Sequence, residues 1–396
     1  MMQEFSRRTR WNLEKTAYAV ALERLRADGK PIFDLTASNP TTCEFEYDRA
    51  GILGALCRPE GLEYEPDPRG LPIARAAVVD YYAKAAASKI SAEQIFLTTS
   101  TSEAYSYLFR LHCDPGAEIL IAQPSYPLFD FLADLDDVRL VPYPLFYDHG
   151  WHIDISTLTE RITSRTRAIV VVHPNNPTGH FTSAAERKLL ERICQEHGLA
   201  LIVDEVFLDY ALHTEDAVEE AHASFSTGEH PVLTYVLSGL SKVAGLPQMK
   251  AAWIAAFGPE PSLEDAAGRL EMIADTFLSM NAPVQHAMPY LLANRDAVQQ
   301  QIRQRVRENL KVLDRLLAGA AVVSRLRIQG GWYAVLRVPA LTSGDELAIR
   351  LMEHERVVVH PGHFYGFDGD GWIVLSLLTP TGEFAEGVAR LLGSIA

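Results

Sequence analysis

The chain has few cysteines, no long apolar run and no block of basic residues, and each shortage excludes a class of protein. Its four cysteines, at positions 43, 57, 113 and 194, include no Cys-x-x-Cys pair, so neither a zinc site nor a disulfide framework is indicated. No uninterrupted apolar segment approaches the length that crosses a bilayer. Residues 1–30 lack the apolar core of a secretory signal. We therefore expect a cytoplasmic protein with reduced thiols and no structural metal.

The charge balance is acidic. The sequence has 36 Lys and Arg against 51 Asp and Glu, which gives a formal net charge of −15. Such a chain repels phosphate backbones and anionic lipids, so we expect no nucleic-acid partner and no membrane partner. With 396 residues, of which 48% are hydrophobic and 22% charged, the composition is that of a folded globular protein of two or three domains.

Apolar runs that resemble strands alternate with helical patterns through the middle of the chain. The runs lie at residues 95–97, 119–122, 168–172, 199–203, 232–237 and 252–256. Between two of them, Ser183 and Glu186 form a capping-box pattern and Gly198 marks a helix end. Continuous apolar strands separated by helices are typical of a mostly parallel sheet that helices cover on both faces. We therefore predict an α/β fold, with residues 48–285 forming a large domain around this sheet.

A second, smaller domain is predicted from the two chain ends. A helical pattern over residues 284–317 is long enough to connect two domains. Beyond it, strand signals at 334–338, 357–360 and 372–378 alternate with helical patterns at 345–355 and 384–395, while a helix and a short strand are indicated at 12–28 and 32–35. We predict that residues 1–47 and 286–396 together form an α+β domain.

Lys242 follows a predicted strand in a loop of small residues, Ser238-Gly-Leu-Ser-Lys242. Open α/β sheets build their sites beyond the carboxyl ends of strands. A lysine in such a place can hold an aldehyde cofactor as a Schiff base if its amine is partly desolvated. A lone loop lysine is more often a solvated surface charge, so the assignment depends on the residues around it.

Polar residues follow the other predicted strands. Residues 98–102 are all Thr or Ser and precede a helix, so they suit a phosphate or simply cap the helix. Tyr126 lies between prolines, where it could stack on a flat ring or pack against the protein. Asn176 lies in a rigid loop after the third run. Asp204 ends a buried strand and needs a cationic partner, and a protonated pyridine nitrogen is such a partner.

Four motifs in this order resemble the class I/II aminotransferases among the fold-type I pyridoxal-phosphate enzymes. They are His173-Pro-Asn-Asn-Pro-Thr-Gly179, Asp204-Glu-Val-Phe207, Ser238-Gly-Leu-Ser-Lys242 and Pro361-Gly-His-Phe-Tyr-Gly366. The resemblance extends from about Asn39 into the C-terminal domain, and the ordered set is far more specific than any one motif. It implies pyridoxal 5′-phosphate as cofactor and transfer of an amino group from a small amino donor, typically an amino acid, to a keto acceptor.

The resemblance also implies residue roles. Lys242 forms the Schiff base and then moves a proton at the substrate α-carbon. Asp204 keeps the pyridine nitrogen protonated, Tyr126 stacks on the ring, and Asn176 bonds its phenolic oxygen. The phosphate is assigned to Ser100, Thr101, Ser102, Ser241 and Lys250, with Tyr64 reaching it from the neighbouring subunit of a homodimer. Lys250 stands where many members have arginine, and a lysine supplies the charge without the bidentate geometry.

Two positions depart from the family pattern. Phe207 stands where members often have tyrosine, so one donor to the phenolic oxygen is missing. Val374 stands where the family has an arginine that pairs with the substrate α-carboxylate. Either another cation replaces it or the substrate is not an ordinary α-amino acid. The candidate cations are Arg69, Arg337, His360 and His363, of which Arg337 is preferred because it lies on a small-domain strand just after the Gly330-Gly-Trp332 turn; Asn39 and His363 are further candidates for substrate contact.

Two other functions are weighed against transamination. A decarboxylase or lyase would use the same lysine and aspartate, because both serve any reaction through an α-carbanion. A pyridoxal-phosphate sensing regulator would need a DNA-binding module, and no such segment is indicated.

Overall fold

A large mixed sheet forms the centre of the protein. The computed structural model describes residues 4–86, 88–127, 129–212 and 223–395. Within these residues the sheet has eight strands in the order β2-β9-β8-β7-β6-β3-β4-β5. The strands are β2 (Ile95–Thr98), β3 (Glu118–Gln123), β4 (Arg139–Tyr147), β5 (Trp151–Ile153), β6 (Thr166–Val172), β7 (Ala200–Asp204), β8 (Thr234–Gly239) and β9 (Ala252–Phe257). Five adjacent strands, β4, β3, β6, β7 and β8, run parallel to one another. At the two edges of the sheet, β5 pairs antiparallel with β4, β9 pairs antiparallel with β8, and β2 pairs antiparallel with β9. The predicted mostly parallel sheet is confirmed.

Strand β4 was not among the predicted strands. It contains Pro142 and Pro144, which cannot donate backbone hydrogen bonds and are typical of edge strands. In the sheet β4 pairs in parallel with β3 on one side. On its other side, only its C-terminal end is paired, antiparallel with the three-residue strand β5. The two prolines therefore hide the strand signal in the sequence, and they are tolerated because the outer side of β4 is only partly paired.

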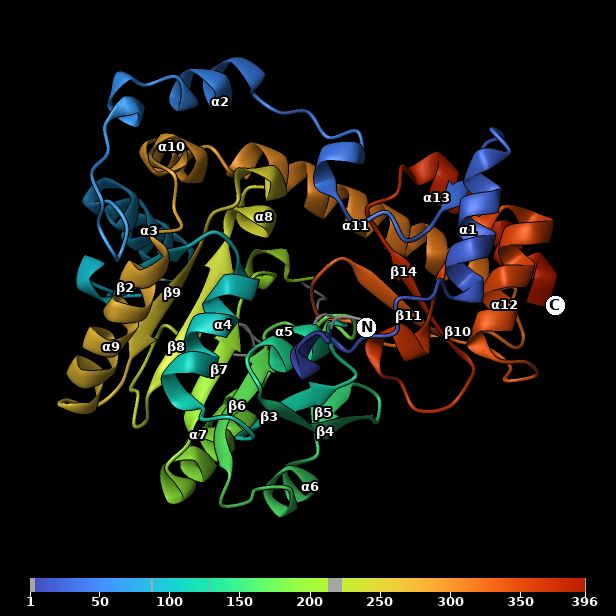
Figure 1. The fold of residues 1–396 in the computed structure, drawn as a ribbon. Coiled ribbons are helices and arrows are strands. Elements are labelled where there is room, and N and C mark those ends of the chain that lie inside the picture. The colour runs from blue at the N-terminus through green and yellow to red at the C-terminus, as the bar shows by residue number, and fades with distance from the viewer. Residues whose placement is uncertain (1–3, 87, 128, 213–222, 396) are drawn as a thin grey trace.

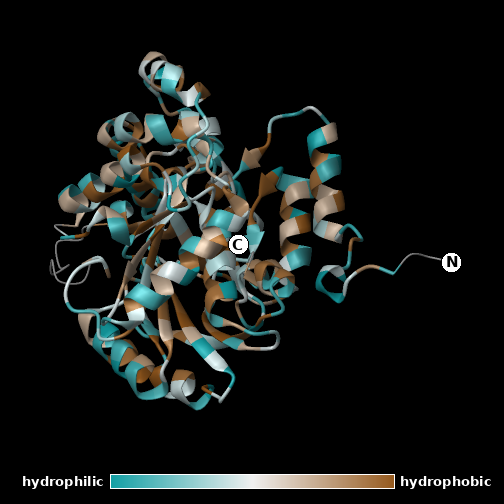
Figure 2. Cartoon of the chain, turned by 60° about the vertical axis from the view of Figure 1, so that its left-hand side comes forward, coloured by the Kyte–Doolittle hydropathy of each residue, from teal (hydrophilic) through white to brown (hydrophobic). Residues whose placement is uncertain are grey.

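Helices cover both faces of the large sheet (Figure 1). The buried strand β7 shows why, because Leu201 and Val203 belong to one apolar core and Ala200 and Ile202 to the other. One face packs against α4 (Thr101–His112), α5 (Phe129–Leu135) and α9 (Ser262–Phe277); the other packs against α3 (Pro72–Ala85), α7 (Ala184–His197) and α10 (Ala282–Ala293). In Figure 2 the strands of this sheet are largely brown and the outer helices carry much of the teal. The predicted capping box of α7 and its left-handed end at Gly198 (φ +66°) are confirmed.

The smaller sheet is built from strands of the C-terminal part of the chain, and a separate strand pair beside it includes the N-terminal part. Its strands are β10 (Ser324–Arg325), β11 (Tyr333–Arg337), β14 (Trp372–Ser376) and β13 (His360–Pro361), in that order. Beside it, β1 (Phe33–Asp34) pairs in parallel with β12 (Val357–Val358). The helices nearby are α1 (Ala17–Ala27), α12 (Gly344–Arg350) with a π-helical turn (Leu351–Glu355), and α13 (Thr381–Ile395). Figure 1 shows the blue α1 beside the orange α12, and the red α13 packs against α11 and β1.

The predicted single helix over residues 284–317 is wrong, because two helices occupy this region. Helix α10 ends at Ala293 and α11 (Asp296–Leu317) begins three residues later. The Asn294 side chain donates to the Tyr290 carbonyl at 2.9 Å, in addition to the Asn294 backbone N–H. A side chain that bonds the helix backbone in this way favours a helix end.

Helix α11 contacts both halves of the structure. Near its start, Gln299 donates to the Val243 carbonyl at 2.7 Å. Three turns later, Asn309 donates to the carbonyls of Leu377 and Thr379, just beyond β14, at 2.9 and 2.7 Å. Both side chains are buried. Among the described helices, none combines the length and apolar character of a membrane span.

Candidate active site

Lys242 lies on α8 (Leu240–Val243), a four-residue helix that follows β8 directly. Its Nζ is 5.0 Å from the ring centre of Trp332 and 5.6 Å from that of Phe207. Burial lowers the pKa of Lys242 to about 8, although the nearby Asp204 carboxylate opposes this shift. An amine that loses its proton this readily can act as a nucleophile near neutral pH.

Asp204 is the last residue of β7, the strand next to β8. Its Oδ2 accepts a hydrogen bond from Tyr105 Oη at 3.1 Å, and its Oδ1 accepts one from the Val206 backbone N–H at 3.0 Å. Burial raises the pKa of Asp204 to about 6, while these two bonds and Lys242 act in the opposite direction. The carboxylate is therefore held in place at a strand end, where a cation would stabilise its charged form.

Asn176 is buried in the loop after β6, and its Oδ1 has no hydrogen-bond partner among the described residues. The adjacent Asn175 has a structural role, because its Oδ1 accepts a bond from Thr178 Oγ1 at 2.8 Å. A buried polar atom without a partner is costly, so a bound polar group suits the place beside Asn176.

Phe207 is buried and packs edge-on against Trp332, with ring centres 4.9 Å apart. The position therefore lines the site around Lys242 but brings no hydroxyl group to it.

Tyr126 lies in the loop after β3 and is 41% exposed. Burial raises the pKa of its phenol to about 12, with Tyr333 and Asp204 adding to the shift. The loop is joined to the turn after β13, because Gln123 Nε2 donates to the Gly366 carbonyl at 2.6 Å. Tyr126 thus lies between the large sheet and the small sheet, near the carboxylate of Asp204.

Helix α4 begins directly after β2, as the Thr/Ser cluster predicts. Ser100 is its N-cap, and Ser100 Oγ accepts a bond from the Glu103 backbone N–H at 3.2 Å. The capping alternative is therefore realised by Ser100. The first-turn N–H groups of Thr101 and Ser102 have no partner within a helix, and an anion at this end is favoured by the helix dipole.

The remaining phosphate candidates lie on exposed or partly exposed segments. Ser241 precedes Lys242 on α8. Lys250 is exposed and has a left-handed backbone conformation (φ +50°) after the short helix Pro247–Met249. Tyr64 is 82% exposed. A side chain this exposed can contact a second subunit without a rearrangement of the subunit that carries it.

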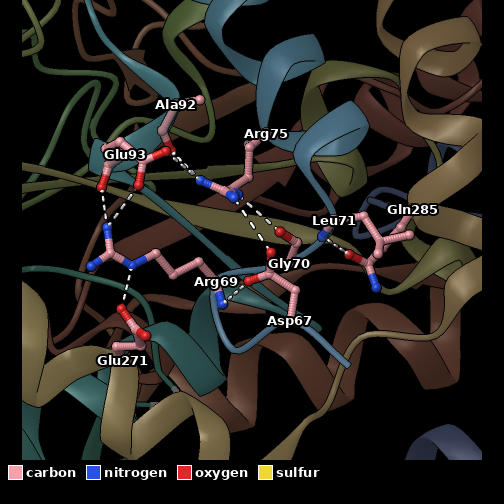
Figure 3. Close-up of polar contacts among 9 residues, drawn as sticks. All are labelled: Asp67, Arg69, Gly70, Leu71, Arg75, Ala92, Glu93, Glu271 and Gln285. Atoms are coloured by element: carbon pink, nitrogen blue, oxygen red, sulfur yellow. Dashed lines mark hydrogen bonds and ion pairs between the residues drawn. The ribbon is translucent and has the colours of Figure 1, made fainter. Parts of the chain in front are cut away.

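Arg69 is held in an ion-pair network shown in Figure 3. Its Nε donates to Glu271 Oε2 at 2.6 Å and its Nη1 to the Glu93 carbonyl at 2.8 Å. The buried Arg75 supports the same loop through the Gly70 carbonyl at 2.9 Å. These bonds give Arg69 a structural role in shaping the loop that follows Tyr64.

Val374 lies on β14 between two register partners, Val335 on β11 and His360 on β13. Residues paired in this way point to the same side of a sheet, and we call these three residues the Val374 face. His360 Nδ1 is 3.1 Å from Tyr365 Oη, and burial lowers the pKa of His360. The Val374 face is consequently apolar, with a histidine that favours its neutral form.

Arg337 follows Val335 by two residues on β11, so it extends the Val374 face by one step. Its guanidinium stacks on the Trp372 ring at 4.2 Å, and its Nη1 donates to the Asp370 carbonyl at 2.8 Å. Arg337 thus points to the same side of the small sheet as Val335, and these contacts restrain its guanidinium.

The other substrate candidates also have partners. His363 Nε2 is 3.6 Å from Asp345 Oδ1 at the surface. Asn39 Oδ1 accepts bonds from the backbone N–H and the hydroxyl of Thr41, at 3.1 and 2.9 Å. Asn39 therefore caps the short helix Pro40–Thr42.

Three residues of the site were not assigned from the sequence. Trp332 lies against Lys242, Tyr105 bonds Asp204, and Tyr210 Oη donates to the Lys242 carbonyl at 2.7 Å. Tyr105 follows Ser102 by three residues, which places it one helical turn from the Thr/Ser cluster on the same side of the helix. That spacing was the available signal for Tyr105.

The chain is similar in sequence to proteins of known families. The sequence pattern of the family described as aminotransferase class I and II matches residues 59–391. The protein named alanine aminotransferase of Mycobacterium tuberculosis is 27% identical over 378 residues, which is 93% of this chain and 86% of that protein. The glutamate-pyruvate aminotransferase AlaA of Escherichia coli is 27% identical over 276 residues, or 70% of this chain and 67% of that protein.

Solved structures agree in fold. An aminotransferase from Escherichia coli superposes with a TM-score of 0.87 at 22% identity, covering 100% of this chain and 98% of the other. An alanine aminotransferase from Pyrococcus furiosus gives 0.85 at 24% identity, with 96% and 95% covered. The large and small sheets described above are thus arranged as in these proteins.

Proposed function

The chain belongs to the aminotransferase class I and II family, and from this premise we propose that it moves an amino group from an amino acid to a keto acid with pyridoxal phosphate held by Lys242. The observation that carries the proposal is the pair at the ends of adjacent strands, the partly buried Lys242 after β8 and the buried Asp204 at the end of β7. The pair joins an easily deprotonated amine to a carboxylate that lacks a full counter-charge. Decarboxylation or elimination is not favoured, because the relatives are named aminotransferases.

The residues present fit pyridoxal phosphate. The partnerless Oδ1 of Asn176 and the buried carboxylate of Asp204 offer polar contacts at one sheet edge. The start of α4 at Thr101 and Ser102, with Ser100, Ser241 and Lys250, offers N–H groups, hydroxyls and a charge for the phosphate. When bound, the cofactor supplies an electron sink for charge that develops at the substrate α-carbon.

The chain's own groups then divide the work. Lys242 Nζ holds the cofactor covalently and, once released by substrate, takes and returns the proton at the substrate α-carbon. Asp204 keeps the pyridine nitrogen charged. Tyr126 covers one face of the ring and orients it. Trp332 and Phe207 exclude water around Nζ, which keeps the amine in its reactive form.

We propose an α-amino acid donor and a 2-keto acid acceptor, with alanine, glutamate and pyruvate as the first compounds to test, because two relatives carry these names. For the substrate carboxylate, Arg337 is our preferred contact because it lies on the Val374 face, with Asn39 and His363 as further candidates. We further propose a homodimer in the cytoplasm, in which the exposed Tyr64 reaches the phosphate of the partner.

The test is a half-reaction followed by absorbance. Purified protein loaded with pyridoxal phosphate is mixed with single amino acids, and conversion of the bound aldehyde to its amine form is recorded. We expect conversion with alanine or glutamate and its reversal with pyruvate. Borohydride reduction and peptide mapping should place the cofactor on Lys242. Release of carbon dioxide without conversion, or a label on another lysine, contradicts the proposal.

A further inference from the structure

The segment that carries Lys242 is held through three of its backbone carbonyls. Each carbonyl accepts a hydrogen bond from the side chain of a residue distant in sequence. The three bonds run from Tyr210 Oη to the Lys242 carbonyl at 2.7 Å, from Gln299 Nε2 to the Val243 carbonyl at 2.7 Å, and from Tyr47 Oη to the Gly245 carbonyl at 2.8 Å. Three separate parts of the chain therefore converge on one short stretch of backbone.

The local structure explains why these donors are needed. Helix α8 has only four residues, so the carbonyls at its end have few partners within the helix. The Lys242 carbonyl also accepts a bond from the Gly245 backbone N–H at 3.2 Å. Val243 and Gly245 are buried, where an unpaired carbonyl is costly. Gly245 has a left-handed backbone (φ +63°), and a Cβ there would lie 3.0 Å from Tyr47 Oη. Glycine thus permits the close approach of Tyr47.

Gln299 is itself fixed in one orientation. Its Oε1 accepts a bond from Arg303 Nη2 at 2.6 Å, and because arginine only donates, this bond sets which end of the amide is Nε2. Nε2 then serves both the Val243 carbonyl and Asp209 Oδ2, the latter at 2.9 Å. Asp209 also accepts a bond from Tyr81 Oη at 3.1 Å. A buried network thus orients the amide that holds the lysine segment.

We propose that Tyr47, Tyr210 and Gln299 form a carbonyl clamp, a set of positioning residues that keeps Lys242 Nζ against the rings of Trp332 and Phe207. Within the segment that carries Lys242 the clamp bonds backbone carbonyls, so it acts on the lysine through the position of α8. Its catalytic relevance rests on the proposed role of Lys242. Its structural effect on Lys242 does not depend on that role, and the two can be tested separately.

The test measures the apparent pKa of Lys242 in the ligand-free full chain, by competitive acetylation at a series of pH values with peptide mass spectrometry. Exposed Lys188 on α7 serves as the reference for reagent reactivity. The variants are Gln299→Leu and Tyr210→Phe. Tyr143→Phe is the matched control, because Tyr143 Oη donates to the buried Val170 carbonyl at 2.9 Å, away from α8.

We expect the pKa of Lys242 to rise from about 8 by about 0.5 or more in both clamp variants, because a loosened α8 lets Nζ reach water. Asp204 is the charged group that acts on Lys242, and none of the variants changes it. The control should leave the value unchanged. An unchanged pKa in both clamp variants, or an equal rise in Tyr143→Phe, overturns the clamp.

Two safeguards keep the result interpretable. If Gln299→Leu does not fold, Tyr210→Phe removes a single hydroxyl and carries the test alone. If borohydride mapping finds no cofactor on Lys242, the proposed function fails while the acetylation result still decides the clamp.

Discussion

The strand-end site of the large sheet and the Val374 face of the small sheet are built in different ways. At the strand-end site, Lys242 lies partly buried against two aromatic rings and Asp204 is buried with two hydrogen-bond donors, and each has a pKa displaced toward neutrality. The Val374 face, by contrast, consists of two valines and a histidine whose pKa is lowered. The strand-end site thus brings together titratable groups with specific contacts, whereas the three residues of the Val374 face include no arginine or lysine.

The strongest challenge to this comparison is Asp204→Ala. We expect activity to fall about 10³-fold, because the ring loses the carboxylate that keeps its nitrogen charged. Asp204→Glu should lose less, and circular dichroism should show both variants folded. If Asp204→Ala turned over near the wild-type rate, the buried carboxylate would not be needed for the reaction, and the strand-end site would no longer differ from the Val374 face in this respect.

The second prediction uses the pH dependence of stability in the ligand-free protein. The pKa of Lys242 is about 8 in the folded chain, against an ordinary lysine value of 10.5. Between these values the unfolded chain binds more protons, so stability rises with pH across this window and the cost of burying the charge is fully present below it. From pH 7.5 to 9.5 the wild type should gain about 2 kcal/mol in unfolding free energy relative to Lys242→Met.

Urea unfolding at both pH values measures that gain. Lys188→Met, an exposed site on α7, is the control and should give a difference near zero. A Lys242 difference that does not change with pH would mean that Nζ is solvated, and the strand-end site would then resemble an ordinary surface.

The third prediction concerns the Val374 face. If Arg337 contacts the substrate carboxylate, Arg337→Leu should raise KM for alanine about tenfold and leave KM for alaninamide nearly unchanged, because a charge-assisted bond is lost only with the acid. Arg325→Leu on the neighbouring strand β10 is the matched control, since Arg325 pairs with Asp314 at 2.8 Å. Equal changes for acid and amide would remove Arg337 from the substrate site.

The smallest expected effect is that of Phe207→Tyr. A hydroxyl at this position would donate to the phenolic oxygen of the bound cofactor and stabilise its charged form. The pH at which the visible absorption of the loaded enzyme changes should fall by about 0.5. A midpoint that stays or moves upward shows that the new hydroxyl points away from the cofactor, despite the contact of Phe207 with Trp332.

The sequence allowed the parallel strands and their polar ends to be predicted, because a continuous apolar run such as residues 199–203 followed by Asp204 has few other interpretations. Prolines 142 and 144 masked β4, and Asn294 ended a helix that periodicity alone extended. These are local effects that compete with the hydrophobic pattern.

The supporting residues of the site could not be predicted in the same way. Tyr105 reaches Asp204 across 99 residues and Gln299 reaches Val243 across 56. Such contacts depend on how helices pack on the sheet. The spacing from Ser102 indicates on which side of α4 Tyr105 lies, but no spacing in the sequence indicates that it reaches Asp204. The residues expected to touch the cofactor carry motifs, whereas the residues that support them do not.

Helix α11 sets the distance between these regions, since Gln299 binds the lysine segment and Asn309 binds the backbone just after β14. The ten-residue step from Gln299 to Asn309 spans about 15 Å of helix axis. A substitution within this span alters one surface, but a single inserted residue would turn one contact by about 100° relative to the other. The length of this span should therefore vary less between related chains than the residues that fill it.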